Sequence, residues 1–206
     1  MKKIAYIYTS HVLVEMVIQK TKTCLPDVDI CNIVNDDLLK LASDCVNDEK
    51  LKQQLLSCYN LAIQTGADII VNTCTSVSGF VDSLAQDIPI PIVNMDEPLV
   101  KQIEQVRTIG VVATIPTAAK RICDIVRLHN HSQIHVALCE NAFQALEEGR
   151  EEEHNTIITK QIDEMIGKYD MILLAQASIE IAIKEKRESV YCLIDNLLSY
   201  LQNTYF

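Results

Sequence analysis

Short apolar runs with a bias toward β-branched residues alternate along this chain with longer stretches in which apolar residues recur every three or four positions. The short runs predict strands at residues 2–8, 28–34, 69–71, 90–95, 108–113 and 134–139, after Asp170, and at residues 190–194. The longer stretches predict helices at residues 12–22, 48–65, 80–86, 98–105, 118–126, 141–168 with a bend near Gly149, and 179–185, and from Asp195 onward. Such alternation of strands and helices is typical of α/β proteins with parallel sheets.

The strand at residues 69–71 ends in a cluster of small polar residues around Cys74. We expect a helix to begin close behind it, near Ser78. Open α/β sheets bind ligands where a parallel strand gives way to a helix. The amides of a helix N-terminus favour negative charge, which predicts a lowered thiol pKa for Cys74. The polar neighbours Asn72, Thr75 and Ser76 strengthen a functional interpretation of this cysteine over a packing role.

The chain nearly repeats itself. Residues 4–9 match 109–114, residues 68–74 match 170–176 and residues 92–96 match 191–195, at offsets of 105, 102 and 99. Repeats of this length indicate a duplicated domain rather than a solenoid. We therefore expect two pseudo-symmetric halves whose strand exits face each other across a cleft. The first half would comprise residues 1–96 plus about 195–206 and carry Cys74; the second would comprise residues 97–194 and carry Gln176 opposite it.

Small hydroxyl side chains follow the strands at equivalent places in both halves. With Asn72 and Gln176 they form the expected binding set for a small carboxylate: Thr9, Ser10, Thr75, Ser76, Thr114, Thr117 and Ser178. Each hydroxyl alone could equally cap a helix. His11 lies beside the first strand exit, where an acid–base or substrate-binding role and a packing or capping role are equally open.

Composition narrows the classes of partner. The chain has 206 residues and a formal charge of −10, which disfavours nucleic acid and anionic membrane surfaces. Its eight cysteines include no C-x-x-C pair, and we expect no metal site and reduced thiols in a cytoplasmic protein. The lysine-containing start followed by a short apolar run is interpreted as a first strand, not a signal peptide. The acidic run around residues 147–154 is expected to be a solvated helix face.

With these residues in view, the chain resembles the aspartate/glutamate/hydantoin racemase superfamily over nearly its whole length. The segments that carry the resemblance are residues 72–76 (NTCTS), 95–98 (MDEP), 110–117 (GVVATIPT), 148–149 with His154, and 174–178 (LAQAS). The resemblance implies two flavodoxin-like halves, a small amino-acid-like carboxylate substrate, no pyridoxal cofactor, no metal, and a dimer or larger assembly. It further implies proton transfer at the substrate's α-carbon by two cysteines, one on each face.

This chain departs from that pattern at one of the two positions. Cys74 matches the first cysteine, but Gln176, after Ala175, stands where the second is expected. A carboxamide has no useful acid–base pKa, so ordinary two-thiol racemisation is not expected. Three interpretations stay open: a one-thiol isomerase, lyase or decarboxylase-like enzyme; a racemase whose second proton donor is His11 or water; and a carboxylate-binding protein that has lost catalysis.

Overall fold

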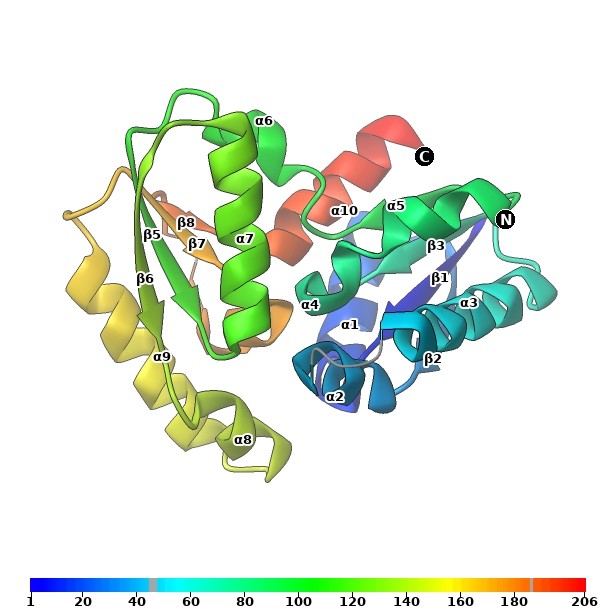
Figure 1. Ribbon diagram of the computed structural model, residues 1–206, viewed down its shortest axis with the longest axis horizontal. Coiled ribbons are helices and arrows are strands. Elements are labelled where there is room, and N and C mark those ends of the chain that lie inside the picture. The colour runs from blue at the N-terminus through cyan, green and yellow to red at the C-terminus, as the bar shows by residue number, and fades with distance from the viewer. Residues whose placement is uncertain (45–47, 186) are drawn as a thin grey trace. The chain divides into compact units, whose positions relative to one another are not determined.

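The computed structural model describes residues 1–44, 48–185 and 187–206, so Cys45 lies outside the described part. The chain forms two compact units, the first of residues 1–97 and 198–206 and the second of residues 98–197. Each unit contains one four-stranded sheet in which every pair of neighbouring strands is parallel (Figure 1). The described helices include none long and apolar enough to cross a membrane.

The first sheet has the strand order β2-β1-β3-β4. Its strands are β1 (Lys3–Tyr8), β2 (Asp29–Val34), β3 (Ile69–Asn72) and β4 (Ile92–Asn94). Its helices are η1 (His11–Leu13), α1 (Val14–Cys24), α2 (Asp37–Asp44), α3 (Asp48–Gln64), α4 (Thr75–Ser78), α5 (Val81–Leu84) and η2 (Ala85–Asp87). Gly66, with φ 76°, takes the left-handed conformation that ends α3.

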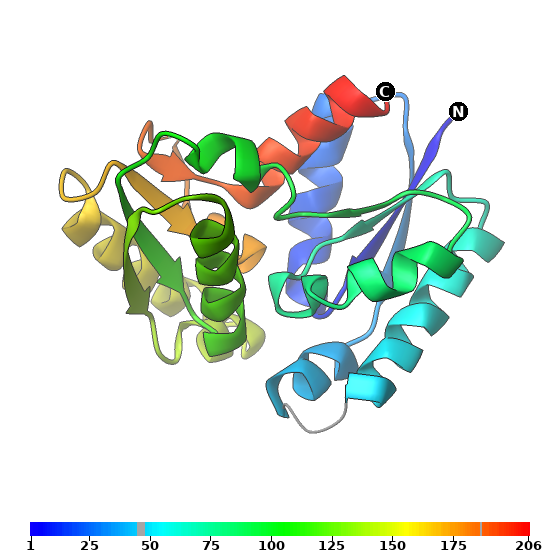
Figure 2. The same cartoon turned by 45° about the horizontal axis from the view of Figure 1, so that its top comes forward.

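Side chains alternate between the two faces of this sheet because the strand repeat is two residues. Ile7 and Ile70 pack on one face in a core with Leu55 of α3. Tyr6 points to the other face, where its hydroxyl lies 2.8 Å from Thr21 Oγ1 of α1. Helices α1 and α3 therefore cover opposite faces (Figure 2). Covered on both sides, β1 and β3 are apolar nearly throughout, as parallel strands require.

The second sheet repeats the order as β6-β5-β7-β8. Its strands are β5 (Thr108–Ala113), β6 (Gln133–Leu138), β7 (Met171–Leu174) and β8 (Val190–Tyr191). Its helices are α6 (Leu99–Ile103), α7 (Pro116–His129), α8 (Ala142–Glu147), α9 (Glu151–Met165), η3 (Ala177–Ala182) and α10 (Leu193–Thr204), which continues into the first unit. The bend expected near Gly149 is confirmed: this glycine, with φ 76°, separates α8 from α9.

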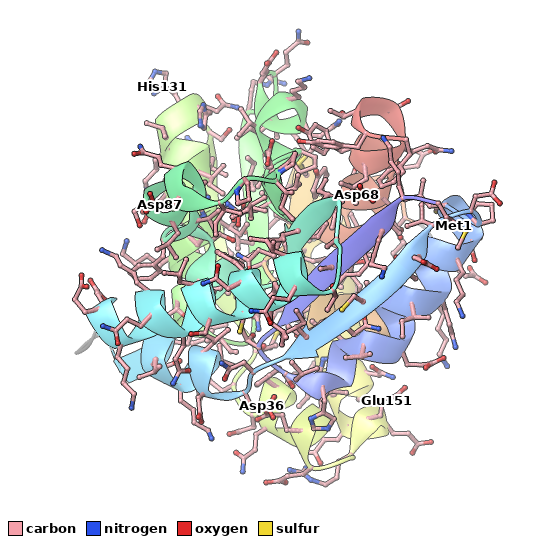
Figure 3. The ribbon with its side chains drawn as sticks, turned by 90° about the vertical axis from the view of Figure 1, so that its right-hand side faces the viewer. Met1, Asp36, Asp68, Asp87, His131 and Glu151 are labelled. Atoms are coloured by element: carbon pink, nitrogen blue, oxygen red, sulfur yellow. The ribbon has the colours of Figure 1, made fainter. Side chains whose placement is uncertain are left out.

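The predicted fold class is confirmed: two α/β halves with equal strand order. One detail marks the duplication. Asp68, labelled in Figure 3, accepts a hydrogen bond from the backbone N–H of Lys3 at 2.8 Å. Asp170 accepts one from the N–H of Thr108 at 2.9 Å. In both halves an aspartate before the third strand thus fastens the start of the first strand.

The third sequence match is wrong by one residue. Val71 pairs with Val93 in the first sheet, and its counterpart Leu173 pairs with Tyr191 in the second. Tyr191 is therefore the counterpart of Val93, at an offset of 98 instead of 99. A shift of one residue places a side chain on the other face of a sheet. The sequence match therefore assigns these side chains to the wrong face of the second sheet. The strand itself is also shorter than expected, because β8 ends at Tyr191 and α10 begins at Leu193.

Gly110 on β5 tests how tightly the second sheet is covered, and Gly79, which follows α4 in the first unit, is its control. A Cβ on Gly110 would overlap Met165 Cε and lie 3.0 Å from Tyr169 Cδ2. Because Met165 is buried in the core, Gly110→Ala should lower the free energy of unfolding by about 1–3 kcal/mol. Gly79 has a helical φ of −64° and nothing within 4 Å of the same atom, so Gly79→Ala should be neutral or slightly stabilising. Equal effects in urea unfolding would contradict the packing described.

Candidate functional site

Cys74 lies two residues beyond the end of β3 and one residue before α4, at the carboxyl edge of the first sheet. The preceding residue, Thr73, fixes this exit with two hydrogen bonds to the carbonyl of Ile7. Its N–H donates at 3.1 Å and its hydroxyl at 2.8 Å. The sequence predicts a helix near Ser78, but the structure begins a helical turn at Thr75, directly after the cysteine. The α4 amides are consequently closer to the thiol than expected.

Four neutral donors surround the Cys74 sulfur. The hydroxyl groups of Thr9 and Ser76 and the backbone N–H groups of Ser76 and Val77 each lower the thiol pKa through hydrogen bonding to the sulfur, and the Val77 N–H also donates to the carbonyl of Cys74 at 3.3 Å. Burial acts in the opposite direction and is the larger effect, so the pKa of Cys74 lies above its ordinary value of 9.0. The expectation of a lowered pKa is therefore wrong. Desolvation of the thiolate outweighs the donors that α4 and Thr9 provide.

Other predicted residues of the first unit lie around this exit. Thr9, Ser10 and Thr75 are buried, Ser76 is partly exposed, and His11 is exposed at the start of η1. Within the described part of the chain, no hydrogen-bond partner is found for the buried Ser10 Oγ. An unsatisfied buried hydroxyl is costly, which makes Ser10 a candidate ligand contact.

Gln176 occupies the matching exit of the second unit, directly after Ala175, whose N–H bonds the carbonyl of Val112 as Thr73 bonds that of Ile7. Its carboxamide is buried, and the carboxamide oxygen fixes its position by accepting hydrogen bonds. Oε1 accepts hydrogen bonds from the Thr114 N–H at 2.8 Å, the Thr114 hydroxyl at 3.0 Å and the Ile115 N–H at 3.1 Å. With the oxygen engaged by three donors, the Nε2 donor is the group that remains for a ligand.

The other predicted residues of the second unit differ in exposure. Thr117 is partly exposed in the first turn of α7. Ser178 is buried in η3, and its hydroxyl finds no partner among the described residues. By the offset of 102 residues it corresponds to Ser76, which donates to the Cys74 sulfur. Each unit thus forms a cluster of its own: Thr9 and Ser76 around Cys74 in the first, and Thr114 with Gln176 in the second.

The prediction of a solvated helix face is wrong for His154, and the buried setting of Asn94 was not predicted. His154, at the end of the acidic run, is fully buried, and burial lowers the pKa of its imidazole. The neighbouring charges are exposed as expected, with Arg150 paired to Glu148 and Glu153. Asn94, at the end of β4, accepts a hydrogen bond from Asn72 Nδ2 at 2.9 Å. The run of apolar residues around Asn94 gave no signal for a buried carboxamide pair.

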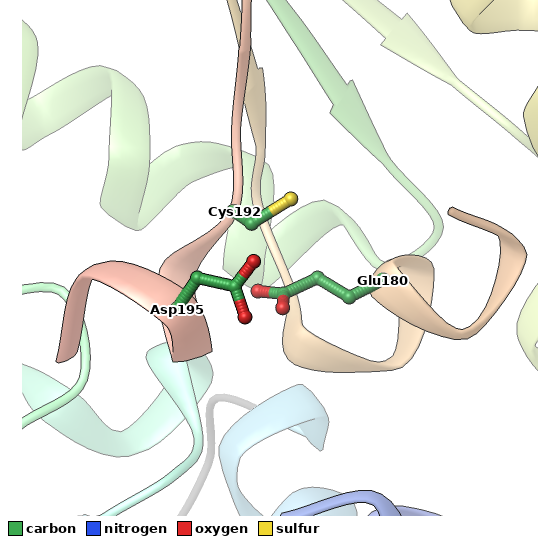
Figure 4. A group of neighbouring side chains, drawn as sticks. All are labelled: Glu180, Cys192 and Asp195. Atoms are coloured by element: carbon green, nitrogen blue, oxygen red, sulfur yellow. The ribbon is translucent and has the colours of Figure 1, made fainter. Parts of the chain in front are cut away.

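Glu180, Cys192 and Asp195 form one group of possible metal-ligating side chains, with ligand atoms within 4.8 Å of one another (Figure 4). The donor set does not indicate a resident metal. Glu180 Oε1 already accepts the Ile194 N–H at 2.8 Å, and α10 begins at this point. A buried carboxylate that satisfies a helix N-terminus accounts for the position of Glu180 without a metal.

Comparison with protein families and solved structures agrees with this architecture. Residues 8–196 match the family described as Asp/Glu/Hydantoin racemase. No curated protein matches the chain. The aspartate racemase of Picrophilus torridus superposes with a TM-score of 0.78 at 14% identity, covering 99% of this chain and 94% of that one.

Two further solved structures are similar. The glutamate racemase of Francisella tularensis subsp. tularensis SCHU S4, in complex with D-glutamate, gives a TM-score of 0.71 at 14% identity over 98% of this chain and 80% of its own. The allantoin racemase of Klebsiella pneumoniae gives 0.70 at 14% identity over 98% and 87%. At such identities these likenesses show a common fold.

The two threonines at the strand exits test the donors at the sulfur. Thr9→Val removes the hydroxyl that donates to Cys74 and keeps the shape of the side chain. The thiol pKa should rise by about half a unit to one unit, because a charge-assisted hydrogen bond is lost. Thr114→Val makes the same change beside Gln176 and should leave the Cys74 pKa unchanged.

The measurement is the pH dependence of iodoacetamide alkylation, followed on the Cys74 peptide by mass spectrometry. An identical pH midpoint in wild type and Thr9→Val would show that Thr9 does not stabilise the thiolate.

Proposed function

Because the chain belongs to the Asp/Glu/hydantoin racemase family, we propose that it is a cofactor-independent enzyme acting at the α-carbon of a small, amino-acid-like carboxylate. In this proposal Cys74 is the catalytic thiol. The observation that carries the assignment is the set of four neutral donors, from Thr9, Ser76 and Val77, that converge on the Cys74 sulfur at a strand exit. Such donors are characteristic of a sulfur that must carry charge during the reaction.

The proposed step is a proton transfer. The Cys74 thiolate takes the α-proton of the substrate, the C–H electron pair moves onto the carboxylate-bearing carbon, and a thiol is left at Cys74. A raised thiol pKa makes the thiolate a stronger base once formed, and it also makes the unliganded thiol mostly protonated at neutral pH. The Thr9 and Ser76 hydroxyls and the α4 amides stabilise the negative charge of the thiolate before the proton is transferred. The carbanion itself needs further donors.

Several groups support binding of a carboxylate. The buried hydroxyls of Ser10 and Ser178 find no partner within the described chain, and Thr75 lies beside Cys74. Gln176 would contribute Nε2, a neutral donor whose direction is fixed by the three bonds to its oxygen. The proposed binding set also includes Thr117, whereas Asn72, which donates to Asn94, and Thr114, which donates to Gln176, contribute through those partners. Neutral donors of this kind bind carboxylates without requiring an arginine.

Gln176 distinguishes the candidate reactions. Its carboxamide cannot return a proton, so we propose that Cys74 exchanges the α-proton on one face of the substrate. Three other outcomes stay open to test: inversion with His11 or water as the second donor, a one-thiol lyase or decarboxylase-like reaction, and binding without catalysis. The expectation that Cys74 and Gln176 address the same substrate stays a prediction, as do a dimer and a reduced cytoplasmic setting.

Deuterium exchange in heavy water tests the proposal. Aspartate and glutamate are the first compounds to assay, and allantoin, which has no carboxylate, is the comparison outside the proposed class; similar structures are racemases of these three compounds. Wild-type protein should incorporate deuterium at the α-carbon with retention of configuration, detected by NMR and chiral chromatography. Cys74→Ser should lower the exchange rate about 10²-fold or more while binding persists, since the proton acceptor is lost.

Cys31→Ser is the matched control, because Cys31 lies on β2, is partly exposed like Cys74 and packs against the core; this variant should exchange at the wild-type rate. Exchange with inversion would instead indicate a second proton donor. Unchanged exchange in Cys74→Ser would remove this cysteine from the mechanism.

A further inference from the structure

A chain of side-chain hydrogen bonds connects the ends of β3 and β4 to the turn that holds Cys74. Asn72 Nδ2 donates to Asn94 Oδ1 at 2.9 Å, and Asn94 Nδ2 donates to the carbonyl of Ser78 at 3.4 Å. Ser78 ends α4, and its hydroxyl donates to the carbonyl of Cys74 at 3.1 Å. The two carboxamides therefore fasten one end of α4 to the sheet, and Ser78 links that end back to Cys74.

This arrangement is costly to the fold. Asn72 is fully buried, and within the described residues its Oδ1 finds no hydrogen-bond partner. An unsatisfied buried acceptor destabilises a protein by about 1–3 kcal/mol. The offset that relates β3 to β7 places Leu174 in the second unit where Asn72 stands in the first, and Leu174 is fully buried too. The same framework thus folds with hydrocarbon at this position.

The carboxamides are placed to act on the turn. Between Cys74 and Ser78, α4 contributes the Ser76 hydroxyl and the N–H groups of Ser76 and Val77 to the sulfur. A helix of four residues has little stability of its own, because nucleation fixes several dihedrals for one hydrogen bond. Its amides keep their direction only if neighbouring groups hold both ends.

We propose that Asn72 and Asn94 are positioning residues that hold the α4 turn so that its amides and the Ser76 hydroxyl face the Cys74 sulfur. Asn72 orients the Asn94 carboxamide, and Asn94 secures the carbonyl of Ser78. The inference deepens the proposed function, on which it rests for the catalytic role of Cys74. The side-chain hydrogen bonds of Asn72 and Asn94 within the described chain go to each other and to Ser78, so both residues act on the sulfur through the turn.

The test is Asn72→Leu, which installs the residue found at the matching position of the second unit. The pH midpoint of Cys74 alkylation, followed on its own peptide, should rise by about half a unit or more, corresponding to about threefold less thiolate at neutral pH. Burial raises the pKa of Cys74, and neutral hydrogen-bond donors lower it. A rise in the alkylation midpoint therefore reports the loss of donors at the sulfur. The midpoint of urea unfolding should change little, because the variant removes the unpaired Asn72 Oδ1 but leaves the buried Asn94 Oδ1 without its donor.

Asn94→Ala provides a second variant with the same expected rise in the alkylation midpoint. Asn130→Ala is the matched control: Asn130 also donates its carboxamide N–H to backbone carbonyls, those of Ile103 at the end of α6 and Val106 after it, but in the second unit. It should leave the Cys74 midpoint unchanged. An unchanged midpoint in folded Asn72→Leu would overturn the inference.

The alkylation measurement needs no substrate, which separates this inference from the proposed function. If the midpoint shifts while Cys74→Ser leaves α-proton exchange intact, the positioning role stands and the catalytic assignment fails. If the midpoint does not shift while Cys74→Ser abolishes exchange, the catalytic assignment stands and the positioning role fails.

Discussion

The balance between desolvation and neutral hydrogen-bond donors at the partly buried Cys74 sulfur is the interaction on which the proposed function depends. Burial at the strand exit raises the pKa of the Cys74 thiol, and the Thr9 hydroxyl and the first amides of α4 oppose that rise. Without the donors, no hydrogen bond would stabilise the negative charge of the desolvated thiolate. Without burial, Cys74 would have an ordinary surface thiol. The parallel sheet provides both conditions, because β1 and β3 end side by side and deliver Thr9 and Cys74 to the same edge.

The two halves share one framework and differ in the side chains at their strand exits. Both sheets have the same order, and in both an aspartate fastens the first strand. At the carboxyl edge the halves diverge. The first unit has a thiol supported by a buried carboxamide pair, whereas the second has Gln176 held by the Thr114 and Ile115 donors above the apolar Leu174. The two halves place residues at equivalent positions, and the side chains at those positions determine the chemical character of each sheet edge.

Much of this organisation could be predicted from the sequence because its determinants are local. Apolar runs of strand length, the left-handed Gly66 and Gly149, and the small polar residues around Cys74 all act within a few residues. The parallel α/β halves and the cysteine at a strand exit follow from those signals. The onset of α4 directly after Cys74 did not follow, because four residues carry too weak a helical period to be recognised.

The features that were missed depend on contacts between distant segments. The one-residue error in the match of β8 arose because two paired residues are too few to fix a register from pattern alone. Asn94 lies within a predicted strand, and only its pairing with Asn72 shows why a carboxamide is buried there. The direction of the Cys74 pKa shift depends on how much protein covers the sulfur, which composition cannot reveal.

The most direct test of the central claim is ligand protection of Cys74. Aspartate, glutamate and allantoin would first be examined for binding by calorimetry, and the rate of Cys74 alkylation would then be measured against the concentration of any that binds. The account predicts saturable protection of Cys74 at the calorimetric affinity, with alkylation of the partly exposed Cys31 unaffected. A ligand that binds with full occupancy and leaves the Cys74 alkylation rate unchanged would contradict the assignment of this sulfur to the substrate site.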